Sequence, residues 1–270
     1  MKKLIKFGVV LFVGGLIATF IGWRMGGAQP VAVGKDWRPK IVHEEVRNKT
    51  LPTITEIDLD VTDANIAIQR GKRYGIRLED RNVGKPTYRV SHQKLTVTQD
   101  WSDSFSGGID WQAAPVHNII ITVPESAVLT NVKINNANGQ INLTDNYINR
   151  LETSQGDGDL FATRGTIKNF KLNSNDGNVH LTQLRVTNGQ AKLRDGSFEM
   201  DSGKLTNKLA VNNYDGLNRV NGVAAKGYYL QTTNGKNRLK SKTSASPIIH
   251  HADQTPLIKL INHDANNVIN

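Results

Sequence analysis

An Asn-Gly or Asp-Gly pair recurs six times after residue 130, and this repeat constrains the fold more than any other feature of the sequence. The glycines of these pairs follow one another at spacings of 19, 19, 19, 20 and 19 residues: Gly139, Gly158, Gly177, Gly196, Gly216 and Gly235. Asn, Asp and Gly tolerate left-handed backbone, so the pairs indicate tight turns. A constant period over six units predicts an internal structural repeat with these glycines at its turns.

The apolar residues keep the same register as the glycines. Four residues after each glycine stand Leu143, Ala162, Leu181, Met200, Val220 and Leu239. A hairpin at each pair, within a meander or sandwich, is one interpretation. A solenoid explains the constant period better, because each coil must lie on the previous one at about 4.8 Å. We therefore predict an all-β fold, a single-chain, β-helix-like β-solenoid with coils of about 19 residues.

The composition limits the chemistry available to the chain. Its 270 residues are enough for a sizeable core, only 6% of them are aromatic, and none is cysteine. The absence of cysteine excludes disulfides, thiolate nucleophiles and Cys-ligated metal centres. The low aromatic share fits a narrow stacked core of Ile, Leu and Val.

The N-terminus has the composition of a membrane-targeting segment. Three lysines within the first six residues precede the uncharged run Phe7–Trp23, which is long enough to cross a bilayer as a helix. We predict that residues 1–24 form a transmembrane anchor. A cleaved signal peptide is the alternative, because Gly26, Gly27 and Ala28 supply small residues where a signal peptidase acts.

Both interpretations of this segment imply export. We therefore expect a single-pass membrane protein whose C-terminal domain lies outside the cytoplasm. An exported chain without cysteine suits a Gram-positive cell envelope.

Three regions are expected along the chain. Residues 1–24 are the anchor, and residues 25–53, with three prolines and no sustained apolar period, are expected to be a stalk or linker. Residues 54–270 are expected to be the solenoid domain, with regular repeats at about 131–240. A C-terminal cap is expected to close the final coil, as solenoid ends require.

Two segments carry a resemblance to a known bacterial family. The run Ile119–Pro124 (IIITVP) is followed by the repeat unit Val132–Leu143 (VKINNANGQINL), and Val61–Ile68 has the form of an opening unit with Ala64 where Gly is more usual. This arrangement resembles the "putative adhesin" domain of unknown function over roughly residues 54–269. The resemblance implies a membrane-anchored β-solenoid of the bacterial envelope, and it supplies no catalytic residues.

A basic alternation near the C-terminus is a candidate ligand site. Lys236, Arg238, Lys240 and Lys242 would point to one face of a single strand and attract an anionic cell-wall polymer or anionic head groups. A charged end strand that prevents further stacking is the alternative. The export signal and the lack of interleaved aromatic residues argue against nucleic acid as a partner.

The acidic residues at the turns are candidates for metal binding and catalysis. Inward-pointing Asp157, Asp176, Asp195 and Asp215 would form a calcium ladder, but Asp before Gly is also ordinary turn chemistry. Asp157 and Asp159 would form a carboxylate pair of the kind that polysaccharide-active β-helix enzymes use. Exposed acids beside a turn explain both patterns more simply, so we predict no enzyme activity, no metal and no cofactor.

The sequence thus favours a non-catalytic, membrane-anchored envelope protein that binds or scaffolds at the bacterial surface. An exposed domain that senses envelope stress and modulates a membrane signalling partner is the alternative, and a polysaccharide-active enzyme is a third hypothesis.

Overall fold

The computed structural model describes residues 2–24, 31–33, 39–41, 43–81, 84–99 and 117–270. The chain divides into two units. The first contains helix α1 (Lys2–Arg24) and a short antiparallel pair, β1 (Val31–Val33) with β2 (Pro39–Ile41). The second contains the remaining strands, from β3 (Glu44–Thr50) to the C-terminus.

Helix α1 coincides with the apolar N-terminal run. A helix satisfies all of its backbone hydrogen bonds internally, which an apolar surrounding requires. Among the described residues, its segment Ile5–Arg24 is the one stretch of helix long and apolar enough to cross a membrane. A signal sequence has the same properties, so the helix is compatible with both interpretations of this segment.

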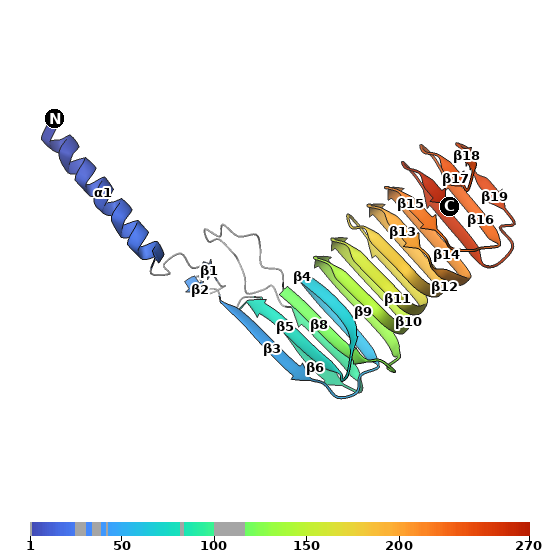
Figure 1. Cartoon of the computed structure of the whole chain (residues 1–270), viewed down its shortest axis with the longest axis horizontal. Helices are drawn as coiled ribbons and strands as arrows, with labels where there is room; N and C mark the ends of the chain where they lie inside the picture. The colour runs from blue at the N-terminus through green and yellow to red at the C-terminus, as the bar shows by residue number, and fades with distance from the viewer. Residues whose placement is uncertain (1, 25–30, 34–38, 42, 82–83, 100–116) are drawn as a thin grey trace. The chain divides into compact units, whose positions relative to one another are not determined.

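The second unit is a stack of parallel coils (Figure 1). Three long strands each form most of one coil of the stack: β10 (Ile141–Asp157), β11 (Leu160–Ser174) and β12 (Val179–Asp195). Ile141 pairs with Leu160, and Leu160 pairs with Val179, so each coil lies one 19-residue repeat above the previous one. This parallel register confirms the predicted all-β solenoid and is incompatible with a meander of hairpins.

One repeat is 20 residues long, and the structure shows where the additional residue lies. After β12 the chain forms β13 (Phe198–Asp201) and β14 (Lys204–Asp215). The pairing of β12 with β14 shifts by one residue between Val186 and Asn188. A bulge therefore absorbs the extra residue, and the apolar columns stay aligned on both sides of it.

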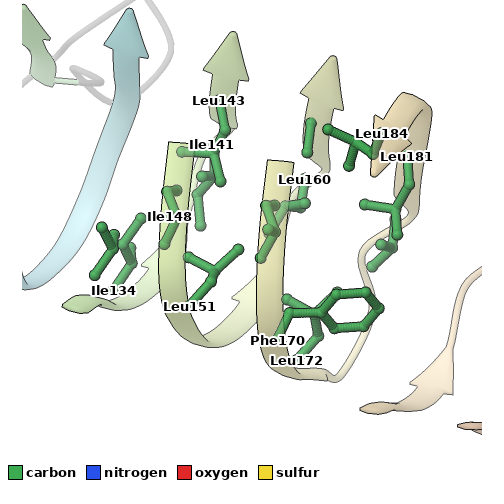
Figure 2. Packing of buried hydrophobic residues seen from close by; sticks show 14 of the residues in the cluster. Ile134, Ile141, Leu143, Ile148, Leu151, Leu160, Phe170, Leu172, Leu181 and Leu184 are labelled. Carbon is green, nitrogen blue, oxygen red and sulfur yellow. The ribbon is translucent and has the colours of Figure 1, made fainter. Parts of the chain in front are cut away.

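The apolar side chains form one continuous core inside the coils. Figure 2 shows Ile141, Leu143, Ile148 and Leu151 of one coil pointing inward, with Leu160 of the next coil beside them. Each of these side chains is almost completely buried. Because every coil buries its inner face against its neighbours, the stack gains stability coil by coil.

The chain bends at two columns of residues in each coil. One is the predicted glycine column, and the other consists of left-handed residues that are not glycine: Asp145, Arg164, Gln183 and Ser202, with φ of 57°, 52°, 55° and 54°. Such a conformation is uncommon for residues with a Cβ atom, although Asp tolerates it better than most. This second column marks the corner at which the coil changes direction.

At the N-terminal end of the stack, a coil is inserted between two later ones. Strand β4 (Glu56–Gly71) pairs in parallel with β7 (Lys94–Gln99) and β8 (His117–Pro124). It also pairs with β9 (Leu129–Asn138) and the start of β10. The end is covered by antiparallel strands, in which β6 (Pro86–Ser91) pairs with β7, and β5 (Gly75–Arg81) with β8 and β3.

At the C-terminal end, the last residues of the chain are inserted in the same way. Strands β20 (Leu257–Asn262) and β21 (Asn267–Ile269) pair with β14 and β15 (Asn218–Asn221). They pair equally with β16 (Gly227–Thr232) and β17 (Asn237–Leu239). The sequence predicted that the C-terminal segment closes over the final coil. This prediction is wrong, because the segment lies inside the stack.

The C-terminal end is instead covered by two short strands. β18 (Lys242–Ser244) pairs antiparallel with β17, and β19 (Ile248–His250) pairs antiparallel with β16. Edges as short as these offer little to a further strand. The expected stalk also needs correction at its end, because β3 lies within residues 25–53 and pairs with β5 along its whole length.

Candidate functional site

Buried polar side chains predominate in the column that lines the inside of the glycine turn: Asn136, Gln155, Ser174, Asn213, Thr232 and Asn262. Two coils have a buried apolar residue at this position, Val61 and Leu193. Gln155 Nε2 donates to the carbonyl of Gly139 at 3.0 Å, and Asn213 Nδ2 donates to the carbonyl of Gly196 at 2.8 Å. These side chains satisfy backbone carbonyls that the tight turn leaves unpaired, so their role is structural.

The six predicted turn glycines lie where neighbouring coils approach most closely. Gly139, Gly158, Gly196 and Gly216 have positive φ, from 103° to 128°. Gly177 and Gly235 do not, but a Cβ atom on Gly177 would lie 1.8 Å from the carbonyl oxygen of Gly158. On Gly235 it would lie 2.2 Å from that of Ala265. Turn conformation and close stacking together favour glycine at these six positions.

The acidic residues before these glycines point away from the coils. Asp157, Asp176, Asp195 and Asp215 are all exposed, whereas a calcium ladder between coils would need them turned inward. Among the described residues, no group of three or more His, Asp or Glu side chains is arranged to hold a metal ion. The acids instead form an exposed row at the tips of the turns.

Asp159 does not form a pair with Asp157. Its Oδ1 accepts hydrogen bonds from the backbone N–H of Asn178 at 2.9 Å and from Asn178 Nδ2 at 3.0 Å. The carboxylate thus fastens one coil to the next. Asp159 therefore has a structural contact between coils, whereas Asp157 is exposed at the turn.

The basic cluster predicted near the C-terminus lies on a hairpin and not on one strand. Lys236 and Arg238 flank Asn237 at β17, Lys240 occupies the turn with φ of 53°, and Lys242 begins β18 opposite Leu239. All four basic side chains are exposed. The prediction of a single cationic stripe is wrong, because the chain reverses direction within it, and the ligand role of the cluster stays a prediction.

A larger basic surface, which the sequence analysis missed, lies on the middle coils. It consists of exposed side chains from β11, β12 and β14, here called the basic face: Lys168, Lys171, Lys192, Arg194 and Lys208. The segments that carry it, 168–175, 187–194 and 206–214, contain no acidic residue. Stacking at 19-residue intervals brings these positions together, although 21 residues separate Lys171 from Lys192 in sequence.

Several other basic residues are engaged by the fold itself. Arg70 donates to the carbonyl oxygens of Asp145, Pro124 and Ala127 at 2.7, 2.6 and 2.9 Å. Arg164 pairs through two nitrogens with both carboxylate oxygens of Asp145, at 2.8 and 2.9 Å. Their guanidinium groups are therefore committed to structural contacts, unlike the ammonium groups of the basic face.

One acidic residue, Glu152, borders the basic face, and the positive charge of its neighbours affects its pKa. Glu152 accepts hydrogen bonds from Arg150 at 2.5 and 3.1 Å and pairs across the coils with Lys133 and Lys171. The hydrogen bond from Arg150, followed by the charges of Arg150, Lys171 and Lys133, lowers the pKa of the Glu152 carboxyl. This carboxylate is stabilised in its charged form by basic neighbours in three coils.

This pKa shift predicts a pH-dependent contribution to stability. A carboxylate whose pKa is lowered by folding stabilises the protein above its ordinary pKa and loses this effect as the pH falls through the folded-state pKa. We expect Glu152→Gln to lower the free energy of unfolding by less than about 1 kcal/mol at pH 7, because the pair is partly exposed. Urea denaturation at pH 7 and pH 3 checks this, and a difference of equal size at both pH values would contradict it.

An open groove lies beside the N-terminal hairpin. It has a volume of about 620 Å³ and is lined by β6 and β7, with Tyr88, Arg89, His92 and Lys94 among its residues and Glu56 of β4 at its edge. Lys94 donates to Asp58 at 2.5 Å, and this hydrogen bond raises the pKa of its ammonium group. Lys94 is thus held by Asp58 of β4, and Arg89 and His92 are exposed.

Coils in parallel register around one continuous core define a parallel β-solenoid protein. Residues 54–253 match the family described as Toastrack DUF4097. The chain belongs to this family of domains of unknown function. The match confirms the resemblance to an adhesin-like family predicted from the sequence.

Comparison with solved structures finds chains of low similarity to this one. A putative adhesin from Bacteroides fragilis is 13% identical, with a TM-score of 0.42, over 84% of this chain and 96% of that one. A putative adhesin from Parabacteroides distasonis is 13% identical, with a TM-score of 0.40, over 84% and 97% of the chains. A protein of the same organism described as a putative lipid binding protein is 12% identical, with a TM-score of 0.35, over 84% and 97%. A search of curated proteins finds no match.

Proposed function

We propose that this protein is a non-catalytic, membrane-anchored component of a Gram-positive cell envelope, and that its solenoid binds or scaffolds other envelope components outside the cytoplasm. The observation that carries the proposal is the repetition of exposed polar side chains over a stack of coils with one rigid core. Repeat proteins use such extended surfaces for binding. Helix α1 supports the membrane attachment.

The topology can be tested by labelling single cysteines, because the natural chain contains none. We expect a membrane-impermeant maleimide to label Thr206→Cys, an exposed position in β14, in intact cells. We expect it to label Lys3→Cys only after lysis. Loss of an N-terminal epitope from the mature chain would show that a signal peptide is cleaved, and labelling of the two positions in the reverse order would contradict the proposed orientation.

Binding and the absence of catalysis need separate measurements. The full chain in neutral-lipid nanodiscs should co-sediment with purified envelope fractions and release no soluble fragments from their polysaccharides. If it sediments with no envelope fraction, the binding role is wrong. Release of fragments that Asp157→Ala abolishes would instead establish an enzyme.

A further inference from the structure

The basic face is unusual because four of its five basic side chains form no ion pair among the described residues. No carboxylate of this part of the chain lies within ion-pair distance of Lys168, Lys171, Lys192 or Lys208. Arg194 has an acidic neighbour, Asp195, at 3.9 Å, and Lys171 lies opposite Glu152, whose carboxylate accepts hydrogen bonds from Arg150. Uncompensated like charges on one surface raise the local concentration of a ligand of opposite charge.

Within β11, β12 and β14, the register of the coils places an uncharged partner beside each lysine of the basic face that it pairs. Lys171 pairs with Gln190, Lys192 pairs with Asn173 and Asn212, and Lys208 pairs with Asn188. Like charges directly opposite each other on neighbouring strands would be destabilising. The alternation avoids this repulsion and keeps positive charge along the whole surface.

An asparagine ladder crosses the basic face. Asn188 Nδ2 donates to Asn169 Oδ1 at 2.9 Å, and Asn207 Nδ2 donates to Asn188 Oδ1 at 2.7 Å. Each amide nitrogen has two hydrogens and uses one of them in the ladder. The remaining hydrogens are donors that repeat at the coil spacing of about 4.8 Å, beside the ammonium groups.

The chemistry of this surface favours a polymer over a bilayer as its partner. Membrane-surface segments combine basic side chains with large apolar ones that enter the lipid. Tyr214 is the one large exposed aromatic or apolar residue in the three segments, and its ring stacks on His263 at 4.7 Å. Ammonium groups bind phosphate as point charges without strict geometry, which suits a polymer whose phosphates vary in position.

We propose that the basic face binds a phosphate-bearing anionic polymer that runs across the coils of β11, β12 and β14. The proposal rests on the proposed envelope function and names the chemical class of its ligand. The row of exposed acids from Asp176 to Asp215 borders this face at the turn tips. Repulsion by that row confines a polyanion to the side of the coils that carries the lysines.

The test compares two triple variants that remove the same number of charges. Lys171→Gln, Lys192→Gln and Lys208→Gln are combined in one variant, and Lys49→Gln, Lys72→Gln and Arg73→Gln, which lie in no candidate site, in its matched control. All six side chains are exposed, and thermal unfolding verifies that both variants fold. The full chain in neutral-lipid nanodiscs is titrated with poly(glycerol phosphate), and with polyglutamate and dextran as reference polymers.

We expect the wild type and the control variant to bind poly(glycerol phosphate) alike. The basic-face variant should bind at least about tenfold more weakly, with a shallower dependence of log Kd on log salt, because fewer counterions are released on binding. Equal binding by the basic-face variant and the wild type would overturn the proposal. Equal weakening of both variants would also overturn it, because binding would then follow net charge alone.

Two further experiments distinguish the proposal from lipid binding and from the proposed function. Tighter binding to vesicles containing phosphatidylglycerol than to the polymer, lost in the basic-face variant, would assign the surface to lipid and overturn the proposal. Sedimentation of the basic-face variant with envelope fractions as efficiently as the wild type would also overturn it, while the proposed function stands. Failure of the wild type to sediment with any fraction would refute the proposed function itself.

Discussion

Gly158→Ala is expected to lower the free energy of unfolding by about 4 kcal/mol. Gly158 has φ of +119°, and a Cβ atom there would lie 2.3 Å from the carbonyl oxygen of Gly139 and 2.9 Å from its carbonyl carbon. These are backbone atoms of the adjacent coil, so relief of the overlap would displace the stack and not one side chain. Urea denaturation followed by circular dichroism measures the change.

The control for this prediction is Gly222→Asn, a glycine of the second bend. Gly222 has φ of +61°, and the nearest atom to an added Cβ is 3.6 Å away. Asn adopts this left-handed conformation with little strain. We expect a loss of no more than about 1 kcal/mol, and losses of equal size for both variants would show that stacking does not restrict Gly158.

Asn267→Ala is expected to have a similarly large effect, because it interrupts a buried ladder of asparagines. Asn267 is completely buried, its Oδ1 accepts from Asn218 Nδ2 at 2.9 Å, and its Nδ2 donates to Asn237 Oδ1 at 2.9 Å and to the carbonyl of Gln231 at 2.7 Å. The substitution leaves these buried groups without partners. Each costs about 1–3 kcal/mol, so we expect a loss of about 4 kcal/mol.

Asn207→Ala is the matched control, since Asn207 belongs to the exposed ladder. Its Nδ2 donates to Asn188 Oδ1 at 2.7 Å, but water can replace it. We expect a change of no more than about 0.5 kcal/mol. Urea denaturation of the two variants side by side distinguishes them, and an Asn267→Ala protein as stable as the wild type would disprove the structural role of the buried ladder.

The stacked coils could be predicted because the spacing of the glycines along the sequence is sufficient to indicate them. Six glycines at a constant period were enough to predict stacked coils, because only a solenoid holds one period over so many units. The second column of bends was not predictable. Asp145, Arg164, Gln183 and Ser202 share a conformation but no side-chain property, and the stack imposes that conformation on them.

Of the two inserted coils, the first was recognised from the sequence as an opening unit with Ala64 in place of glycine, and the second escaped prediction. Asp63-Ala64 and Asp264-Ala265 occupy the turn positions at which other coils have Asp-Gly or Asn-Gly. A search for Asp-Ala in the same apolar context would have located the second coil as well. Their order in the stack would still be hidden, since the apolar residues of β16 and β20 follow the same alternating pattern.

The basic residues of the candidate site could be predicted from the sequence only in part. Sequence inspection detects basic residues that are close in the chain, and so it selected Lys236 to Lys242. The basic face gathers residues from three repeats, and the stacking register decides which of them become neighbours. Once the 19-residue period is known, aligning the repeats would reveal this surface without a structure.

The insertion of β20 and β21 between earlier coils also determines when the molecule can be completed. Coil 227–239 reaches its place only after residues 257–269 have entered the stack beneath it. Until then, the edge of β14 is open to β16 or to a strand of another molecule. Residues 257–269 therefore permit the final assembly step, and only a chain that contains them covers the edge of β14 with its own strand.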